Sequence, residues 1–264
     1  MTGTLERALK ILEHLSSFPE GASLAALAAG LELPASACHR LLTELIRCGF
    51  VRQDREFGDY ALTTKIAAIG LSHLTNTGIV DMAQPIIDQV AQESGELVRL
   101  SIIDGERLTF VAKAQGARAG LRYDPDMGLD VMLSCSAAGH AWLMTLPDDQ
   151  VLDILQRHGL GSPEKFGPKA PTSIRAVRKY IAEARERGFS MISEVFAPAM
   201  SSVGAPIQRK GQPAIGVLTI AGPLVRFTEK RMLSIGPLLI NAAADLALAS
   251  AGSPMFAKRA KKAA

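Results

Sequence analysis

The sequence contains little cysteine and has no long uncharged apolar run. Its three cysteines, Cys38, Cys48 and Cys135, form no CxxC pair, which argues against a disulfide framework and against a cysteine-rich zinc site. There is no stretch of about 18 or more uncharged apolar residues, and the N-terminus opens on a charged segment instead of a basic and then apolar leader. We therefore expect a cytoplasmic protein with no membrane span, no metal and no cofactor.

The N-terminal region also lacks an excess of positive charge. The chain carries a net charge of +3, but Lys258, Arg259, Lys261 and Lys262 near its end account for more than that surplus. Residues 1–64 hold six Lys or Arg against eight Asp or Glu. Total charge therefore does not identify a nucleic-acid-binding domain, and only a local pattern can.

Length and composition favour a protein of two folded domains. The chain has 264 residues, of which 48% are hydrophobic and 21% charged, enough apolar side chains for two cores. We place an N-terminal domain at 1–62, a helical linker at 63–78 and a larger domain at 79–250. The remaining tail, 251–264, is expected to be basic and disordered.

Short helices are predicted in the N-terminal domain. Apolar residues at helical spacing indicate the first, over 5–15. Ser23 is a typical N-cap for a second helix, which Gly30 is expected to close in a left-handed conformation. Pro34 is suited to the first position of a third helix, which continues over 35–48.

The third helix has one apolar and one polar face. Its predicted buried stripe consists of Leu41, Leu42, Leu45 and Ile46, and its opposite face carries Ser36, His39, Arg40, Thr43 and Arg47. Short polar residues at a helix start let the backbone enter the major groove of DNA, where Arg and His reach bases or phosphates. The pattern predicts a recognition helix for double-stranded DNA. A small helical protein-interaction domain is the alternative.

A short hairpin is predicted directly after this helix. Apolar residues on either side of a charged turn over 52–59, which contains Gly58, indicate two short strands. Such a hairpin is a wing beside a recognition helix, and Arg52 and Arg55 are placed to meet the phosphate backbone. The first domain is therefore expected to be a winged helix-turn-helix.

The larger domain mixes strands and helices. Asp104 and Gly105 form a typical hairpin turn between strands at 96–104 and 106–114. Further strands are predicted at 121–123, 189–192, 203–207 and 214–220, and helices at 65–75, 82–94, 136–145, 148–158, 172–187 and 228–249. This irregular order predicts an α+β domain around an antiparallel sheet.

A ligand pocket is predicted where small and hydroxyl-bearing residues lead into a helix, in "VMLSCSAAGHAW" over 131–142. Free N–H groups at a helix start favour an anion such as a carboxylate. Ser202 and Thr219 are further candidates, because a hydroxyl on an otherwise apolar strand needs a partner. A small organic acid is the expected ligand.

The segments "TLERALKILEHL", "LPASACHRLLTELIRCGFVRQD" and "YALTTKIAAIG" resemble the N-terminal half of the IclR family of bacterial transcriptional regulators. The resemblance, which covers about residues 5–250, implies a GAF-like α+β effector domain and a linker helix between the domains. It implies that Ser36, Ala37, His39 and Arg40 lie in the major groove. Ala37 stands where the family usually has threonine.

For the effector domain the resemblance implies a pocket formed by Tyr123, Val131, Ala137, Ala138, Ile192, Ser202 and Thr219. Ser134, Cys135, Ser136, Gly139 and His140 occupy the places of the family's pocket motif, with Ser134 where histidine is usual. Ile192 stands where an acidic residue is common, which favours an apolar or aromatic ligand.

Two other functions fit parts of the sequence. Cys135 and His140, with Glu194 as a third member, resemble a nucleophile and its base, although their spacing matches no known catalytic motif. A ligand-independent DNA-binding protein is the other alternative, but it would not need so large a second domain. We predict a regulator that is not an enzyme, acts as a homodimer or homotetramer, and binds a pseudo-palindromic operator and a small-molecule effector.

Overall fold

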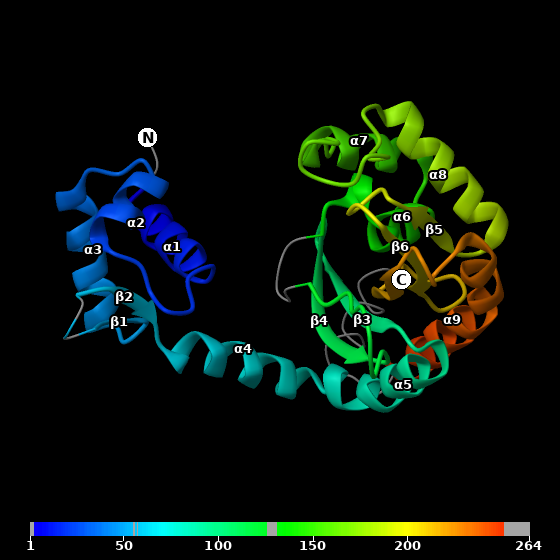
Figure 1. Cartoon of the computed structure of the whole chain (residues 1–264), viewed down its shortest axis with the longest axis horizontal. Coiled ribbons are helices and arrows are strands. Elements are labelled where there is room, and N and C mark those ends of the chain that lie inside the picture. The colour runs from blue at the N-terminus through cyan, green and yellow to red at the C-terminus, as the bar shows by residue number, and fades with distance from the viewer. Residues whose placement is uncertain (1–2, 55, 57, 126–130, 251–264) are drawn as a thin grey trace. The chain divides into compact units, whose positions relative to one another are not determined.

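The computed structural model describes residues 3–54, 56, 58–125 and 131–250. The chain divides into two compact units, the first ending at Asn76 and the second beginning at Thr77 (Figure 1). Arg55 and the tail 251–264, both named in the sequence predictions, lie outside the described residues.

The first unit combines short helices with a two-stranded hairpin. Its elements are α1 (Thr4–Leu15), α2 (Leu24–Gly30), α3 (Ala35–Arg47), β1 (Val51–Gln53), β2 (Tyr60–Leu62) and α4 (Thr64–Thr77). Ile11, Leu15, Leu27, Leu42, Val51 and Tyr60 are among the residues of its core. Ala22 and Tyr60 exchange backbone hydrogen bonds of 2.9 Å, which join the segment before α2 to the hairpin. This is the predicted winged helix-turn-helix.

The boundaries of these helices follow local signals, with two differences. Ser23 accepts a hydrogen bond from Ala26 N at 3.2 Å and is the predicted cap. Gly30 is not left-handed; that conformation belongs to Glu32, with φ 53°. A Cβ on Gly30 would lie 2.6 Å from the His14 ring, so α1 and α2 are closely packed there and a larger residue would require His14 to move. Pro34 precedes α3 instead of starting it.

The second unit is an α+β domain, as predicted. It contains α5 (Ile79–Ser94), β3 (Leu97–Asp104), β4 (Arg107–Gln115), a 3-10 turn (Leu133–Cys135), α6 (Ala137–Leu143), α7 (Asp148–His158), α8 (Ile174–Arg187), β5 (Ser190–Ser193), β6 (Met200–Ile207), β7 (Gly216–Pro223) and α9 (Glu229–Ala249). The strands form one antiparallel sheet in the order β4-β3-β7-β6-β5.

The two faces of this sheet differ in chemistry, because side chains alternate along each strand. Val98, Leu100, Val203, Leu218 and Ile220 lie on one face and pack against α5 and α9 in an apolar core. The opposite face carries smaller and more polar residues, and α6 packs on it. There Ser190 donates a hydrogen bond to the Ala137 carbonyl at 2.6 Å. The cavity lined by predicted effector residues, described below, lies on this second face.

Three predictions about the second unit need correction. Residues 121–123 form no strand. The hairpin pairs Asp104 with Arg107, so its central residues are Gly105 and Glu106, one position later than predicted. Helix α5 begins at Ile79 instead of Met82. The apolar pattern of 121–123 suggested a strand, but Leu121 is 65% exposed and has no neighbouring strand to pair with in the described sheet.

One helix of the described chain, α9, is long and apolar enough to cross a membrane by composition alone. It packs instead against α5, β6 and β7, and Leu239, Ala243 and Leu246 are among its buried residues. Its apolar character therefore belongs to the core of the second unit.

Candidate functional site

The outer face of α3 is exposed and polar, as predicted. Cys38, Leu41, Leu42 and Leu45 are the buried residues of the helix, whereas Ile46, assigned to the buried stripe, is 37% exposed. Ser36, His39, Arg40, Thr43 and Arg47 are all exposed, and Ala37 is half-buried. The predicted DNA-contacting side chains thus share one accessible surface of the first unit.

The cations on this face are not equivalent. Arg47 forms an ion pair with Glu44, with Nη2 2.8 Å from the carboxylate oxygen. Within the described residues, Arg40 and His39 form no ion pair. A phosphate or a base edge can therefore engage Arg40 directly, whereas at Arg47 it must compete with Glu44.

The wing is a minimal hairpin beside α3. Val51 pairs with Leu62 and Gln53 with Tyr60, and the Gln53 side chain donates to the Gly58 carbonyl at 2.9 Å. Arg52 is exposed on the first strand. Lys65 Nζ donates to the Cys48 carbonyl at 2.7 Å and so fixes the C-terminal end of α3; the sequence reasoning did not anticipate this contact.

A cavity lies between the polar face of the sheet and α6. It encloses about 280 Å³ including its mouth. Six of the predicted effector residues line it, namely Ser136, Ala137, Ala138, Ile192, Ser202 and Thr219, and so do Arg99, Phe110, Phe196 and Met200, which were not predicted. Most of this volume is open to solvent or lies between the lining side chains, and the space that the centre of a water molecule can occupy is only about 20 Å³. A small ligand therefore fits only if these side chains move apart.

Four predicted effector residues do not line this cavity. Val131 donates its N–H to the Leu108 carbonyl and packs in the core around Trp142. Ser134 is fully buried, and its hydroxyl accepts from Gly161 N at 3.0 Å. Cys135 is buried beside it, and Tyr123 lies near Arg99, whose guanidinium carbon is 6.0 Å from the Tyr123 ring. Val131, Ser134 and Cys135 therefore support the turn before α6.

The hydroxyl groups of the cavity are already engaged. Ser202 donates to the Ile220 carbonyl at 2.9 Å, and Thr219 donates to the Arg99 carbonyl at 3.3 Å. Ser136 caps α6 by accepting from Gly139 N at 3.0 Å. Because the Ser202 and Thr219 hydrogens point to carbonyls, these groups offer a ligand only acceptor lone pairs. The donors that an anion requires must come from another residue.

Arg99 is the cavity residue that sequence reasoning missed. It is only 6% exposed, and its guanidinium carbon lies 3.8 Å from the centroid of the Phe110 ring. Burial lowers the pKa of Arg99, and the nearby Tyr123 and Asp124 act in the opposite direction. The signal in the sequence was a single arginine within the otherwise apolar strand segment "LVRLSIID". Arginine is almost never fully buried unless it is paired.

The suggested pair of Cys135 and His140 has no catalytic geometry. His140 is fully buried, its Nε2–H donates to the Ser134 carbonyl at 2.8 Å, and its ring stacks on Tyr180. Burial lowers the pKa of His140 to about 4 and raises the pKa of the Cys135 thiol. Both shifts favour the neutral forms, and a neutral buried thiol is a poor nucleophile. Within the described chain, no cluster of three or more His, Cys, Asp or Glu residues is placed to hold a metal ion.

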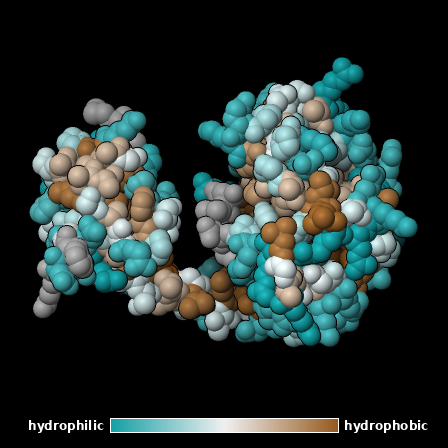
Figure 2. Space-filling model, viewed as in Figure 1, coloured by the Kyte–Doolittle hydropathy of each residue, from teal (hydrophilic) through white to brown (hydrophobic). Residues whose placement is uncertain are grey.

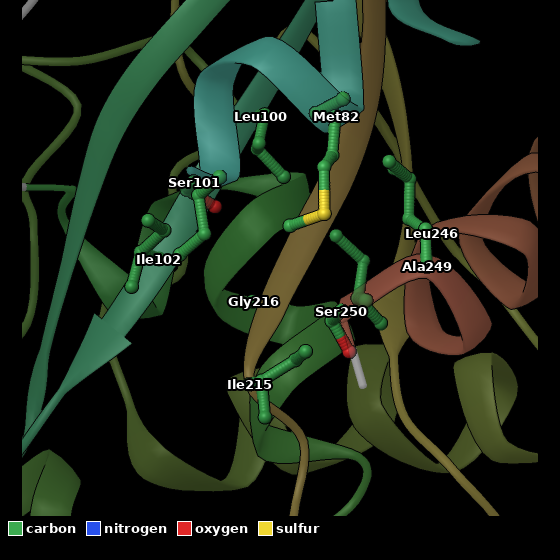
Figure 3. Close-up of a pocket in the computed structure, with 12 residues that line it drawn as sticks. Met82, Leu100, Ser101, Ile102, Ile215, Gly216, Leu246, Ala249 and Ser250 are labelled. Carbon is green, nitrogen blue, oxygen red and sulfur yellow. The ribbon is translucent and has the colours of Figure 1, made fainter. Parts of the chain in front are cut away.

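A second cavity lies on the apolar face of the sheet, among α5, β3 and the end of α9. It encloses about 340 Å³ including its mouth. Figure 3 shows Met82 extending between Leu100 and Leu246. Ser101 and Ser250 are the polar residues that line it, and none of its lining residues is charged. Among the described residues, this cavity therefore has no charged group that would attract an acid.

Two family models match the chain. One, described as the IclR helix-turn-helix domain, matches residues 4–55, and the other, described as the C-terminal domain of the bacterial transcriptional regulator IclR, matches residues 71–248. The acetate operon repressor of Salmonella typhimurium is 30% identical over 251 residues, which is 95% of this chain and 90% of that protein. The transcriptional repressor IclR of Escherichia coli is 29% identical over 250 residues, or 94% and 90% of the two chains.

Solved structures share the fold. An IclR homologue from Microbacterium hydrocarbonoxydans, crystallised in complex with 4-hydroxybenzoate, superposes with a TM-score of 0.76 at 19% sequence identity. The match covers 95% of this chain and 100% of that chain.

Proposed function

The chain belongs to the IclR family of bacterial transcriptional regulators, and from this premise we propose that it is a cytoplasmic, effector-responsive regulator of a pseudo-palindromic operator. Helix α3 and the wing bind the DNA, and a small organic acid binds in the cavity between α6 and the sheet. The relatives from Salmonella typhimurium and Escherichia coli are repressors, so we expect this protein to repress transcription.

The exposed face of α3 is the observation that carries the proposal. The predicted DNA contacts are Ser36, Ala37, His39, Arg40, Thr43, Arg47, Arg52 and Arg55. Among them we assign the main base contact to Arg40. It is exposed, and its guanidinium is not held by any carboxylate in the described part of the chain. A bidentate contact of arginine with guanine is worth about 1–3 kcal/mol of base discrimination.

Apolar side chains left exposed on the first unit support a homodimer or homotetramer. Leu5 and Leu9 of α1 are 74% and 50% exposed, and Ile69 and Leu71 of α4 are 54% and 64% exposed. Figure 2 shows hydrophobic surface along α4. Exposed apolar surface of this kind typically marks an interface. We propose that a second copy covers it, which duplicates the recognition helix about a two-fold axis as a pseudo-palindromic operator requires.

The effector site is the cavity on the polar face of the sheet. Ile192, Phe110 and Phe196 provide apolar contact, which suits an aromatic acid or another acid with an apolar body. The complex of the Microbacterium relative with 4-hydroxybenzoate is consistent with such a ligand. Of the predicted effector residues, we retain Ser136, Ala137, Ala138, Ile192, Ser202 and Thr219 as direct contacts.

Effector binding is expected to change operator binding through the chain segment that joins the two units. Strand β3 lines the cavity and follows α5 directly, and α5 follows α4 after a left-handed Gly78. A ligand that binds one conformation of β3 and α5 more tightly than another shifts their populations. The spacing of the recognition helices in the dimer would shift with them.

Two observations weigh against the alternatives. The neutral, buried states of Cys135 and His140 argue against an enzyme. The lined cavity in the second unit argues against a DNA-binding protein without ligand control.

The proposal is tested by fluorescence anisotropy, which measures the affinity of the protein for a labelled duplex taken from upstream of its own gene, at one salt concentration. We expect specific binding that is much tighter than binding to a scrambled duplex of equal length, and a change in affinity when an acid ligand is added. Equal affinity for both duplexes would contradict the proposal.

A further inference from the structure

Arg99 carries a buried charge without a carboxylate partner among the described residues. It lies on the middle part of β3, opposite Thr219 of β7, and only 6% of it is exposed. No Asp or Glu forms an ion pair with it in the described part of the chain, and its Nε has no hydrogen-bond partner there. The half-buried Arg226 differs, because it forms a bidentate pair with Glu96, at 2.6 and 2.9 Å.

The guanidinium of Arg99 lies over the aromatic ring of Phe110. Phe110 packs against the flat face of the guanidinium at 3.8 Å. A β-bulge between Leu100 and Ser101 shifts the register of β4 and places Phe110 opposite Ser101, on the same side of the sheet as Arg99. Stacking on a face stabilises the cation but leaves its in-plane N–H groups available for a carboxylate.

A second unsatisfied polar group lies beside Arg99. The hydroxyl of Tyr123 is buried and has no hydrogen-bond partner within the described residues, and the Tyr123 ring is 6.0 Å from the guanidinium carbon. Buried polar groups are almost always satisfied, and the described residues supply no anionic partner for the Arg99 guanidinium. Arg99 lines the cavity between α6 and the sheet, where a ligand can supply one.

We propose that Arg99 binds the carboxylate of the effector and that the effector is an aromatic monocarboxylate. The inference rests on the proposed effector role of this cavity. Phe110 and Phe196 contact the ring of the ligand, while Ser202 and Thr219 offer acceptors to any hydroxyl that it carries.

Isothermal titration calorimetry on the full chain tests the assignment. The probes are benzoate and 4-hydroxybenzoate, with benzamide and 4-hydroxybenzamide as uncharged analogues of the same shape, and propionate as an acid without a ring. We expect wild-type protein to prefer an acid over its amide at least tenfold, and to bind propionate less tightly than the aromatic acids. The variant Arg99→Gln should lose the preference for acid over amide. Arg122→Gln, which removes an exposed arginine outside the cavity lining, should keep it.

Thermal melting of the ligand-free proteins separates a binding role from a structural one. If Arg99 serves the effector, Arg99→Gln and Arg99→Met remove an uncompensated buried charge and melt no lower than wild type. A large fall in melting temperature in both variants would make Arg99 structural and overturn the inference.

The binding outcomes also distinguish this inference from the proposed function. If wild type binds an acid and Arg99→Gln binds it equally well, Arg99 is not the anchor, but the effector cavity stands. If an amide binds as well as its acid, or propionate as well as benzoate, the ligand class is wrong. If none of these acids binds wild type, the aromatic acid assignment fails, and a lack of any operator response to other acids would remove the proposed function as well.

Discussion

The buried histidine of α6 makes the stability of the second unit depend on pH. His140 has a folded pKa of about 4, because burial penalises its charged form, against an ordinary value of 6.5. Between these values the unfolded chain binds more protons than the folded one. The contribution of His140 is therefore fully present above about pH 6.5 and is lost as the pH falls toward 4. Lowering the pH from about 7.5 to about 5 should cost about 2 kcal/mol at this site.

Trp142 provides the assay. It is the single tryptophan of the chain, it is 5% exposed, and it lies on α6 two positions after His140. Urea unfolding followed by its fluorescence therefore reports on the second unit. In His140→Gln the side-chain amide can still donate to the Ser134 carbonyl, but it does not titrate. The fall in the free energy of unfolding between about pH 7.5 and about pH 5 should therefore be about 2 kcal/mol smaller than in wild type, whatever the absolute stability of the variant.

His73→Gln is the matched control, because His73 is exposed on α4. It should retain the wild-type pH dependence. An unchanged pH dependence in His140→Gln would refute the assignment of a neutral, buried His140.

Three further predictions concern separate parts of the molecule. Arg40→Ala should weaken operator binding at least tenfold with little change in melting temperature, and Arg47→Ala should weaken it less, because Glu44 already pairs with Arg47; anisotropy that ranks them in the opposite order would contradict this. Leu71→Glu should shift the protein toward monomer in analytical ultracentrifugation, since Leu71 is 64% exposed; an unchanged oligomer would count against α4 as an interface. Gly204→Ala should destabilise the second unit by about 1–3 kcal/mol in urea unfolding, because the new Cβ would lie 2.7 Å from the Ala137 carbonyl oxygen of α6. A variant as stable as wild type would show that α6 can shift at little cost.

The fold was largely predictable because local signals agreed with tertiary packing. Helices α8 and α9 end at Arg187 and Ala249, as the predicted ranges have them, and Gly188 follows α8 in a left-handed conformation. The polar face of α3 was also readable, since a helix with a strict apolar stripe leaves the opposite side exposed. Gly30 was misread, because its need for space comes from His14 on another helix, which sequence neighbours cannot reveal.

The effector cavity was only partly predictable. Ser202 and Thr219 were identified because a hydroxyl on an apolar strand is unusual, and both line the cavity. Arg99 escaped because its position opposite Thr219 depends on pairing between strands about 120 residues apart. Ser134 and Cys135 were chosen by their place in a motif, but the turn before α6 directs them into the core.

The central claim is that an acid bound beside Arg99 controls binding of DNA by α3. Its most direct test is the operator affinity of the full-length protein, measured by anisotropy at one salt concentration with and without benzoate or 4-hydroxybenzoate. We predict a change of at least tenfold with the acid and none with the amide. In Arg99→Gln, operator binding should persist without any response. An operator affinity that is the same with and without every acid, or an Arg99→Gln protein that responds as wild type does, would contradict the account.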